Sequence, residues 1–163
     1  VEAVSTTNKI SAYFQTMQFL LANNKLVRGK EFKVVYPRQL KVKKLGSRDY
    51  EPYEVAPEQR VLFINFSLVY NAYRLVEGKE ALSKQSLINY FESNAAYIGH
   101  VKNTKYKYYE DESIEEEDAF GQMVIKRVSK KRESVNSAYV FDYDMIAQLM
   151  DIDLLQGAEL EEE

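Results

Sequence analysis

Residues 82–91, LSKQSLINYF, have the pattern of a short capped helix in the middle of the chain. Ser83 is a typical N-cap, because its hydroxyl can accept a hydrogen bond from a backbone N–H of the first turn. Helical spacing predicts that one apolar face points inward, and this face carries Leu87, Ile88 and Phe91. The opposite, exposed face then carries Lys84, Gln85, Asn89 and Glu92.

The segments on either side of this helix predict a winged-helix-like core. Upstream, residues 61–66 are a short apolar run typical of a buried strand, and residues 68–77 predict a helix that ends at Gly78. Downstream, residues 97–101 and 104–109 predict two strands. This is the element order of a winged helix, in which the second helix enters the major groove and a basic hairpin contacts the backbone. The same order also occurs in protein-interaction domains.

Further elements surround this core and complete the predicted fold class, α+β. Residues 8–22 predict an N-terminal helix, and residues 32–36 and 40–43 predict strands with one basic face. Two more strands, 122–128 and 138–143, are expected around a basic turn. The acidic residues 110–118 are expected to form a loop, and a last helix covers residues 145–150. The sequence therefore predicts a winged-helix-like core with an N-terminal helix and added β-strands. It forms one domain over residues 1–156, with an acidic flexible tail over 157–163.

The composition excludes several classes of site. The chain has 163 residues, 13 tyrosines, no tryptophan and no cysteine, so disulfides, cysteine-based metal sites and cysteine nucleophiles are absent. A cysteine-free chain fits a reducing compartment, and the expected location is the cytoplasm. No segment has the length and apolarity of a membrane span. The first residue is Val1 rather than methionine, so we expect a domain cut from a larger protein.

Charge is distributed very unevenly along the chain, although the net charge is only −3. Residues 110–118 contain seven acids and no base, and residues 142–163 contain eight acids and no base. Between them, residues 126–132 contain five bases and no acid. This local asymmetry makes residues 126–132 the strongest electrostatic signal that we take from the sequence.

These patterns support a nucleic-acid interface with two kinds of contact. On the helix, Lys84, Gln85 and Asn89 could reach base edges. Phosphates would be neutralised by the predicted hairpin or by the basic turn, whose cations are Lys102, Lys105, Lys107, Lys126, Arg127, Lys130, Lys131 and Arg132. The alternative is a capped surface helix beside a solvated hairpin. If both charged segments are flexible, the acidic run competes with nucleic acid for the basic turn.

No residue pattern predicts catalysis, a cofactor or a metal. His100 is the single histidine and is expected to be structural, because one histidine cannot build a multi-histidine metal site. The clustered acids lie in a predicted loop and tail rather than on rigid elements. The run KYKYY at 105–109 could stack bases, but a half-buried strand has the same alternation. The chain also lacks a Gly-rich phosphate loop and a nucleophile elbow.

Several segments together resemble the C-terminal region of primase–helicase proteins carried by mobile elements and phages. The resemblance covers roughly residues 8–155 and rests on apolar positions in four stretches: VLFINF at 61–66, LSKQSLINYF at 82–91, YIG at 97–99 and SAYVFDY at 137–143. It implies an accessory winged-helix-like domain that follows ATPase or primase modules and touches DNA or neighbouring subunits. The ATP-binding motifs and primase zinc ligands of that family are absent from this chain.

The expected function is therefore a non-catalytic accessory DNA-binding domain of a larger replication protein, with DNA and other domains or subunits of that protein as partners. The alternative is a protein-interaction or oligomerisation module that uses the first helix and a tyrosine-rich surface. The nucleic-acid interpretation requires the cations to gather on one exposed face without being masked by the neighbouring glutamates.

Overall fold

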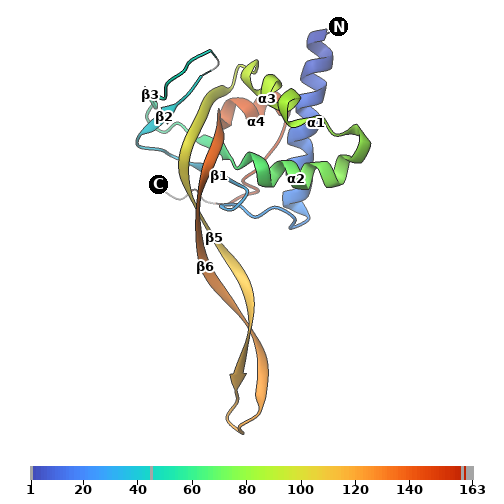
Figure 1. The fold of residues 1–163 in the computed structure, drawn as a ribbon, viewed down its shortest axis with the longest axis vertical. Coiled ribbons are helices and arrows are strands. Elements are labelled where there is room, and N and C mark those ends of the chain that lie inside the picture. The colour runs from blue at the N-terminus through green and yellow to red at the C-terminus, as the bar shows by residue number, and fades with distance from the viewer. Residues whose placement is uncertain (1, 45, 159, 161–163) are drawn as a thin grey trace.

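The protein consists of a body and a long two-stranded arm that projects from it (Figure 1). The structure, a computed structural model, describes residues 2–44, 46–158 and 160. Its elements in chain order are α1 (Glu2–Ala22), β1 (Phe32–Val35), β2 (Leu40–Val42), β3 (Glu51–Tyr53), β4 (Val61–Ile64), α2 (Phe66–Glu77), a 3₁₀ turn η1 (Gly78–Glu80), α3 (Lys84–Glu92), β5 (Tyr97–Glu117), β6 (Met123–Asp142) and α4 (Tyr143–Met150).

Two antiparallel sheets and four α-helices confirm the α+β fold class. The main sheet has the order β1-β4-β6-β5, and β2 and β3 form a separate pair. Helices α2 and α3 precede the β5–β6 hairpin in the order that the sequence predicts. The finer prediction, a winged-helix core, stays a prediction.

A cluster of aromatic rings holds the helices on one face of the main sheet. Phe91 of α3 is fully buried and lies at the centre of this cluster. Its ring centroid is 5.4 Å from that of Tyr13 on α1, 5.7 Å from Phe66 on α2 and 5.2 Å from Phe141 on β6. Mostly edge-on contacts of this kind stabilise a core beyond the burial of apolar area alone. The inward face predicted for residues 82–91 is thus correct for Leu87 and Phe91, and Ser83 is the N-cap, accepting from Ser86 N at 3.2 Å.

A second, smaller core lies on the opposite face of the sheet. It joins the β2–β3 pair to β4, β5 and β6 through buried residues that include Val42, Phe63, Tyr106 and Val140. Because β4 is covered on both faces, all four of its residues are buried. Burial on both faces explains why residues 61–64 form a continuous apolar run without alternation.

The prediction for residues 97–143 was wrong in its details. The predicted strands 97–101 and 104–109 and the predicted loop 110–118 form the single strand β5, and the predicted strands 122–128 and 138–143 belong to the single strand β6. The expected basic turn is therefore strand, and the reversal lies at residues 118–122. Acidic side chains on β5 and basic side chains on β6 give each strand a partner that neither segment reveals on its own. Of the predicted tail, residues 157, 158 and 160 are described, and the remainder lies outside the described residues.

The arm is the part of this hairpin that leaves the body. Beyond Tyr108, the described residues of β5 and β6 pair only with each other, in a register that runs without interruption to Glu117 opposite Met123. Asp118 closes the tip, where its Oδ1 accepts from the N–H groups of Phe120 and Gln122, both at 2.9 Å.

The root of the arm is fixed to the body by two close contacts. The amine of Lys33, on β1, is buried and donates to the carbonyl oxygen of Lys105 at 2.9 Å. Gly29 lies against β5 with φ +99°, and a Cβ placed there would lie 2.2 Å from the carbonyl oxygen of Lys107. Only glycine allows the segment before β1 to approach the root this closely.

We expect Gly29→Ala to lower the free energy of unfolding by about 3 kcal/mol, because backbone strain adds to the displacement of a backbone carbonyl. Gly46→Ala is the control, since Gly46 also has positive φ (+79°) but nothing lies within 4 Å of its added Cβ. That variant should lose only about 1 kcal/mol. Urea denaturation of both variants measures the difference, and equal losses would contradict the close approach at Lys107.

Candidate nucleic-acid interface

The predicted nucleic-acid-binding residues lie in three separate places. The first is the exposed face of α3, with Lys84, Gln85 and Asn89. Lys84 Nζ lies 5.4 Å from the ring centroid of Tyr70, and Gln85 Nε2 donates to Asn89 Oδ1 at 3.0 Å. These side chains already contact neighbours on the helices, but all three remain exposed to solvent.

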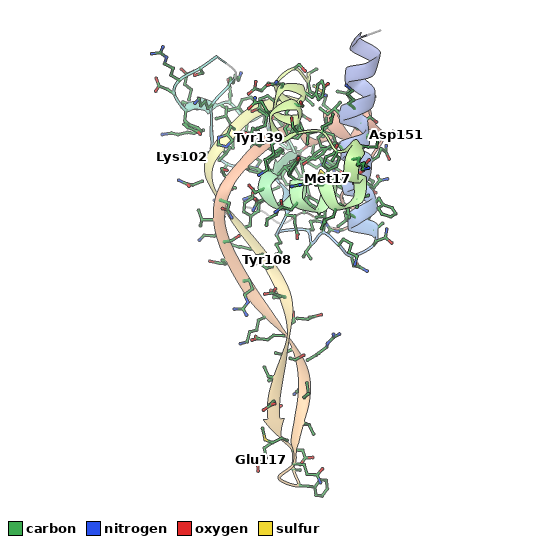
Figure 2. All side chains as sticks on the ribbon, turned by 45° about the vertical axis from the view of Figure 1, so that its right-hand side comes forward. Met17, Lys102, Tyr108, Glu117, Tyr139 and Asp151 are labelled. Carbon is green, nitrogen blue, oxygen red and sulfur yellow. The ribbon has the colours of Figure 1, made fainter. Side chains whose placement is uncertain are left out.

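The second place is the root of β5, where Lys102, Lys105 and Lys107 are exposed. Lys105 Nζ lies 3.9 Å from a carboxylate oxygen of Glu133 on β6. Lys102 lines a hollow at the surface of the body. Figure 2 shows Lys102 at the upper end of the arm, close to Tyr139 and far from the tip at Glu117.

The third place is the arm, where the acidic run faces the basic run. Alternate residues of the paired strands share a face, and one face carries Glu110, Glu112 and Glu116 together with Lys126, Lys130 and Arg132. Ion pairs join these side chains: Lys130 to Glu112 at 2.9 Å, Arg132 to Glu110 at 3.4 Å and to Glu112 at 3.5 Å, and Lys126 to Glu116 at 3.6 Å.

The other face of the arm carries Arg127 and Lys131, which make no ion pair with any described residue. Over residues 110–132, seven acids outnumber five bases. The arm as a whole is therefore electrostatically negative and attracts a phosphate backbone poorly. The five cations that formed the strongest signal in the sequence do not make a positive surface.

A different set of lysines does make a positive surface, on the body. Lys41 and Lys102 line a hollow of about 340 Å³, together with the polar side chains of Gln39, Asn103 and Thr104. Lys43 and Lys44 line a second hollow of about 320 Å³, and Tyr50 lines both. We call these two adjoining hollows the basic groove. Its four lysines are exposed, and no ion pair joins them to any residue that the structure describes.

Aromatic side chains line the groove beside these lysines. Tyr50, Tyr97 and Tyr139 are half-buried, and Tyr50 Oη lies 2.8 Å from His100 Nδ1. Burial, and secondarily the nearby charge of Lys43, lowers the pKa of His100, so the imidazole is neutral at neutral pH. Burial also raises the pKa of Tyr139. Among the described residues that line the two hollows, Glu92 is the one acid.

A basic stretch of the sequence contributes most of this groove, although no residue in it was predicted to bind nucleic acid. From Lys25 to Arg48 nine residues are basic, and Glu31 is the one acid. We predicted a basic face on the strands in this segment but nominated no residue there. Lys102 is the one groove lysine among the nominated residues, because the pairing of β5 with the segment after β2 joins chain segments far apart in sequence.

Two other classes of site have no candidate among the described residues. In the described ranges, no group of histidine and acidic side chains has the arrangement of a metal site. No helix within those ranges is both long enough and apolar enough to span a membrane.

Comparison with known proteins returned no matching family model, curated protein or solved structure.

The ion pairs of the arm predict that the arm opens in acid before the body does. Lys130, which bonds to Glu112, lowers the pKa of that carboxyl below its ordinary value of 4.5. Ionised Glu112 therefore stabilises the arm above that ordinary value, and this contribution is lost as the pH falls through the lowered pKa. Protonation of the other acids leaves the β6 cations to repel one another.

Amide NMR spectra between pH 7 and pH 3 would measure this opening. We expect the signals of residues 109–131 to lose strand character while those of β4 and Phe91 persist. Simultaneous loss in both regions would contradict an arm stabilised by its own charges.

Proposed function

We propose that this chain is a non-catalytic accessory domain that binds nucleic acid, DNA in the first instance, through the basic groove. The observation that carries the proposal is the convergence of Lys41, Lys43, Lys44 and Lys102, exposed and without ion pairs to described residues, on hollows lined by tyrosines. The sequence resemblance to primase–helicase proteins supports a parent protein that acts in replication. The proposed contact is therefore on the body instead of on the arm.

The groove combines the two interactions that a single strand requires. Lysines neutralise phosphates and release their counterions, which makes binding strongly dependent on salt. Half-exposed tyrosine rings can stack on unpaired bases without selecting a sequence. A duplex keeps its bases stacked inside and would use only the lysines, so the proposal favours a single strand over a duplex.

The resemblance also supports a second contact through a winged-helix core, which we retain as part of the proposal. In that arrangement α3 would lie on a duplex with Lys84, Gln85 and Asn89 toward it, and the hairpin would serve as the wing. The negative balance of the arm disfavours the wing as a phosphate contact. Replacing the three α3 residues by alanine would separate this mode, because it should weaken duplex binding and leave single-strand binding unchanged.

The groove proposal predicts that Lys41→Glu combined with Lys102→Glu weakens the binding of a labelled single-stranded oligonucleotide at least about tenfold at low salt. The slope of log affinity against log salt should fall by about 2, one for each lost phosphate contact. Fluorescence anisotropy across a salt series measures both quantities.

A matched pair on the arm, Arg127→Glu with Lys131→Glu, makes the same change in net charge at two exposed cations outside the groove. This control should leave the affinity close to that of the unaltered chain. The reverse result, loss at the arm and none at the groove, would return the interface to the arm, and loss at neither would exclude nucleic acid as the partner.

The arm favours a second candidate function, a protein-interaction or oligomerisation module. Its tip exposes large apolar side chains: Phe120 is 90% exposed, Ile125 76% and Met123 63%. Exposed apolar clusters on a projecting element are typical of contact sites. A two-stranded ribbon is also marginally stable on its own and offers free strand edges, so a partner would stabilise it.

If the tip joins copies of the chain, Phe120→Ser with Ile125→Ser should convert a concentration-dependent oligomer into a monomer. Sedimentation velocity over a concentration series measures this change. Leu75→Ser is the control, because Leu75 is 87% exposed on α2 of the body. A monomer at every concentration before any substitution would rule out self-association through the tip.

A further inference from the structure

A third hollow, of about 290 Å³, lies at the N-terminus of α2, where β6 passes the start of the helix. The first helical residues, Phe66, Ser67 and Leu68, form one wall. Asn136 and Ser137 of β6 form another, with His100 and Tyr139 beside them. We call this hollow the α2 pocket.

The backbone donors at this end of the helix have no acceptor among the described residues. Val69 N–H donates to the carbonyl of Asn65 at 3.1 Å, and this is the first hydrogen bond of the helix. The N–H groups of Phe66, Ser67 and Leu68 therefore precede the intrahelical ladder, and no described residue accepts from them. The first turn contains no acidic residue to complement the positive end of the helix dipole.

The N-cap residue supplies an independent sign of a missing ligand. Asn65 is 5% exposed and lines the pocket, and its Nδ2 has no hydrogen-bond partner among the described residues. Its side chain also makes no capping hydrogen bond to the helix. An N-cap asparagine ordinarily accepts from the first turn, and a buried amide donor without an acceptor is costly. Both departures are resolved if an acceptor group enters the pocket.

We propose that the α2 pocket binds a phosphate group. Three backbone amides, the amides of Asn65 and Asn136 and the hydroxyls of Ser67 and Ser137 can all donate, and no acid is among the described residues that line the pocket. A carboxylate has only two oxygens, whereas a phosphate presents more acceptor oxygens and a larger charge to the dipole. Helix N-termini with free amides bind phosphates in this way.

The pocket contains no lysine or arginine among its described lining residues, so recognition relies on neutral donors. It therefore differs from the basic groove, although His100 and Tyr139 line both. This inference does not depend on the groove binding nucleic acid. The ligand would be free phosphate, a terminal phosphate of a nucleotide chain or a phosphate within such a chain.

The test is a titration of the full chain with inorganic phosphate, followed by amide NMR. We expect saturable shifts at the backbone amides of residues 66–68 and at the side-chain amide of Asn65. Asn65→Asp should weaken phosphate binding at least about tenfold, because it places a carboxylate against the anion while keeping a good N-cap. Asn71→Asp makes the same change at an exposed position of the same helix and should bind as the unaltered chain does.

A second variant, Asn136→Asp, guards against a local rearrangement of the helix, since it approaches the pocket from β6. The proposal is overturned if phosphate causes no saturable shift at residues 65–68, or if folded Asn65→Asp and Asn136→Asp chains both bind as well as the Asn71→Asp control. Amide spectra without phosphate show whether each variant is folded.

Competition by oligonucleotides identifies the source of the phosphate. If only a 5′-phosphorylated strand displaces inorganic phosphate, the pocket takes a terminal group. If an unphosphorylated strand displaces it as well, the pocket takes a phosphate within the chain. Either result supports a phosphate pocket. Loss of strand binding in the Lys41→Glu, Lys102→Glu chain with phosphate binding intact would show that the groove and the pocket act separately.

Discussion

One antiparallel register between β5 and β6, continuous from Thr104 to Glu117, fixes both the arm and its electrostatics. The register is set in the body, where Val140 and Phe141 are fully buried on opposite faces of β6. A slip by one residue would exchange the two faces and expose both core contacts. Core packing therefore determines which charges meet in the arm. The ion pairs there are exposed and contribute little to stability individually, so they follow from the register and do not create it.

This constraint separates cations that look alike in the sequence into two environments. Lys130 and Arg132 lie opposite a strand of acids, and their charge is neutralised within the arm. Lys41 and Lys102 come from β2 and β5, and no acid is among the described residues that line the hollow they share. The field at a surface depends on the sum of neighbouring charges, so a dense basic run can be less attractive to phosphate than four dispersed lysines.

Local signals in the sequence predicted the parts of the fold that depend on local chemistry. The capped helix 84–92 follows from Ser83 and from the spacing of Leu87 and Phe91, and the buried strand β4 follows from its apolar run. The arm could not be predicted in the same way, because an acidic run without alternating apolar residues resembles a loop until its basic partner is placed beside it. The groove joins Lys41 to Lys102 across 60 intervening residues, and no local pattern contains that contact.

The position of His100 links the groove to the α2 pocket physically. Its Nδ1 is paired with Tyr50, a lining residue of the groove, while the same ring lines the pocket at the start of α2. Backbone hydrogen bonds of 2.9 and 3.0 Å to Lys43 hold the histidine in place between the two. If Tyr50 donates to Nδ1, the neutral ring carries its proton on Nε2 and can donate a hydrogen bond of its own. A phosphate that raised the proton affinity of this ring would strengthen the positive potential of the groove next to it. The single histidine, expected from the sequence to be purely structural, therefore occupies a position from which both sites can be influenced together.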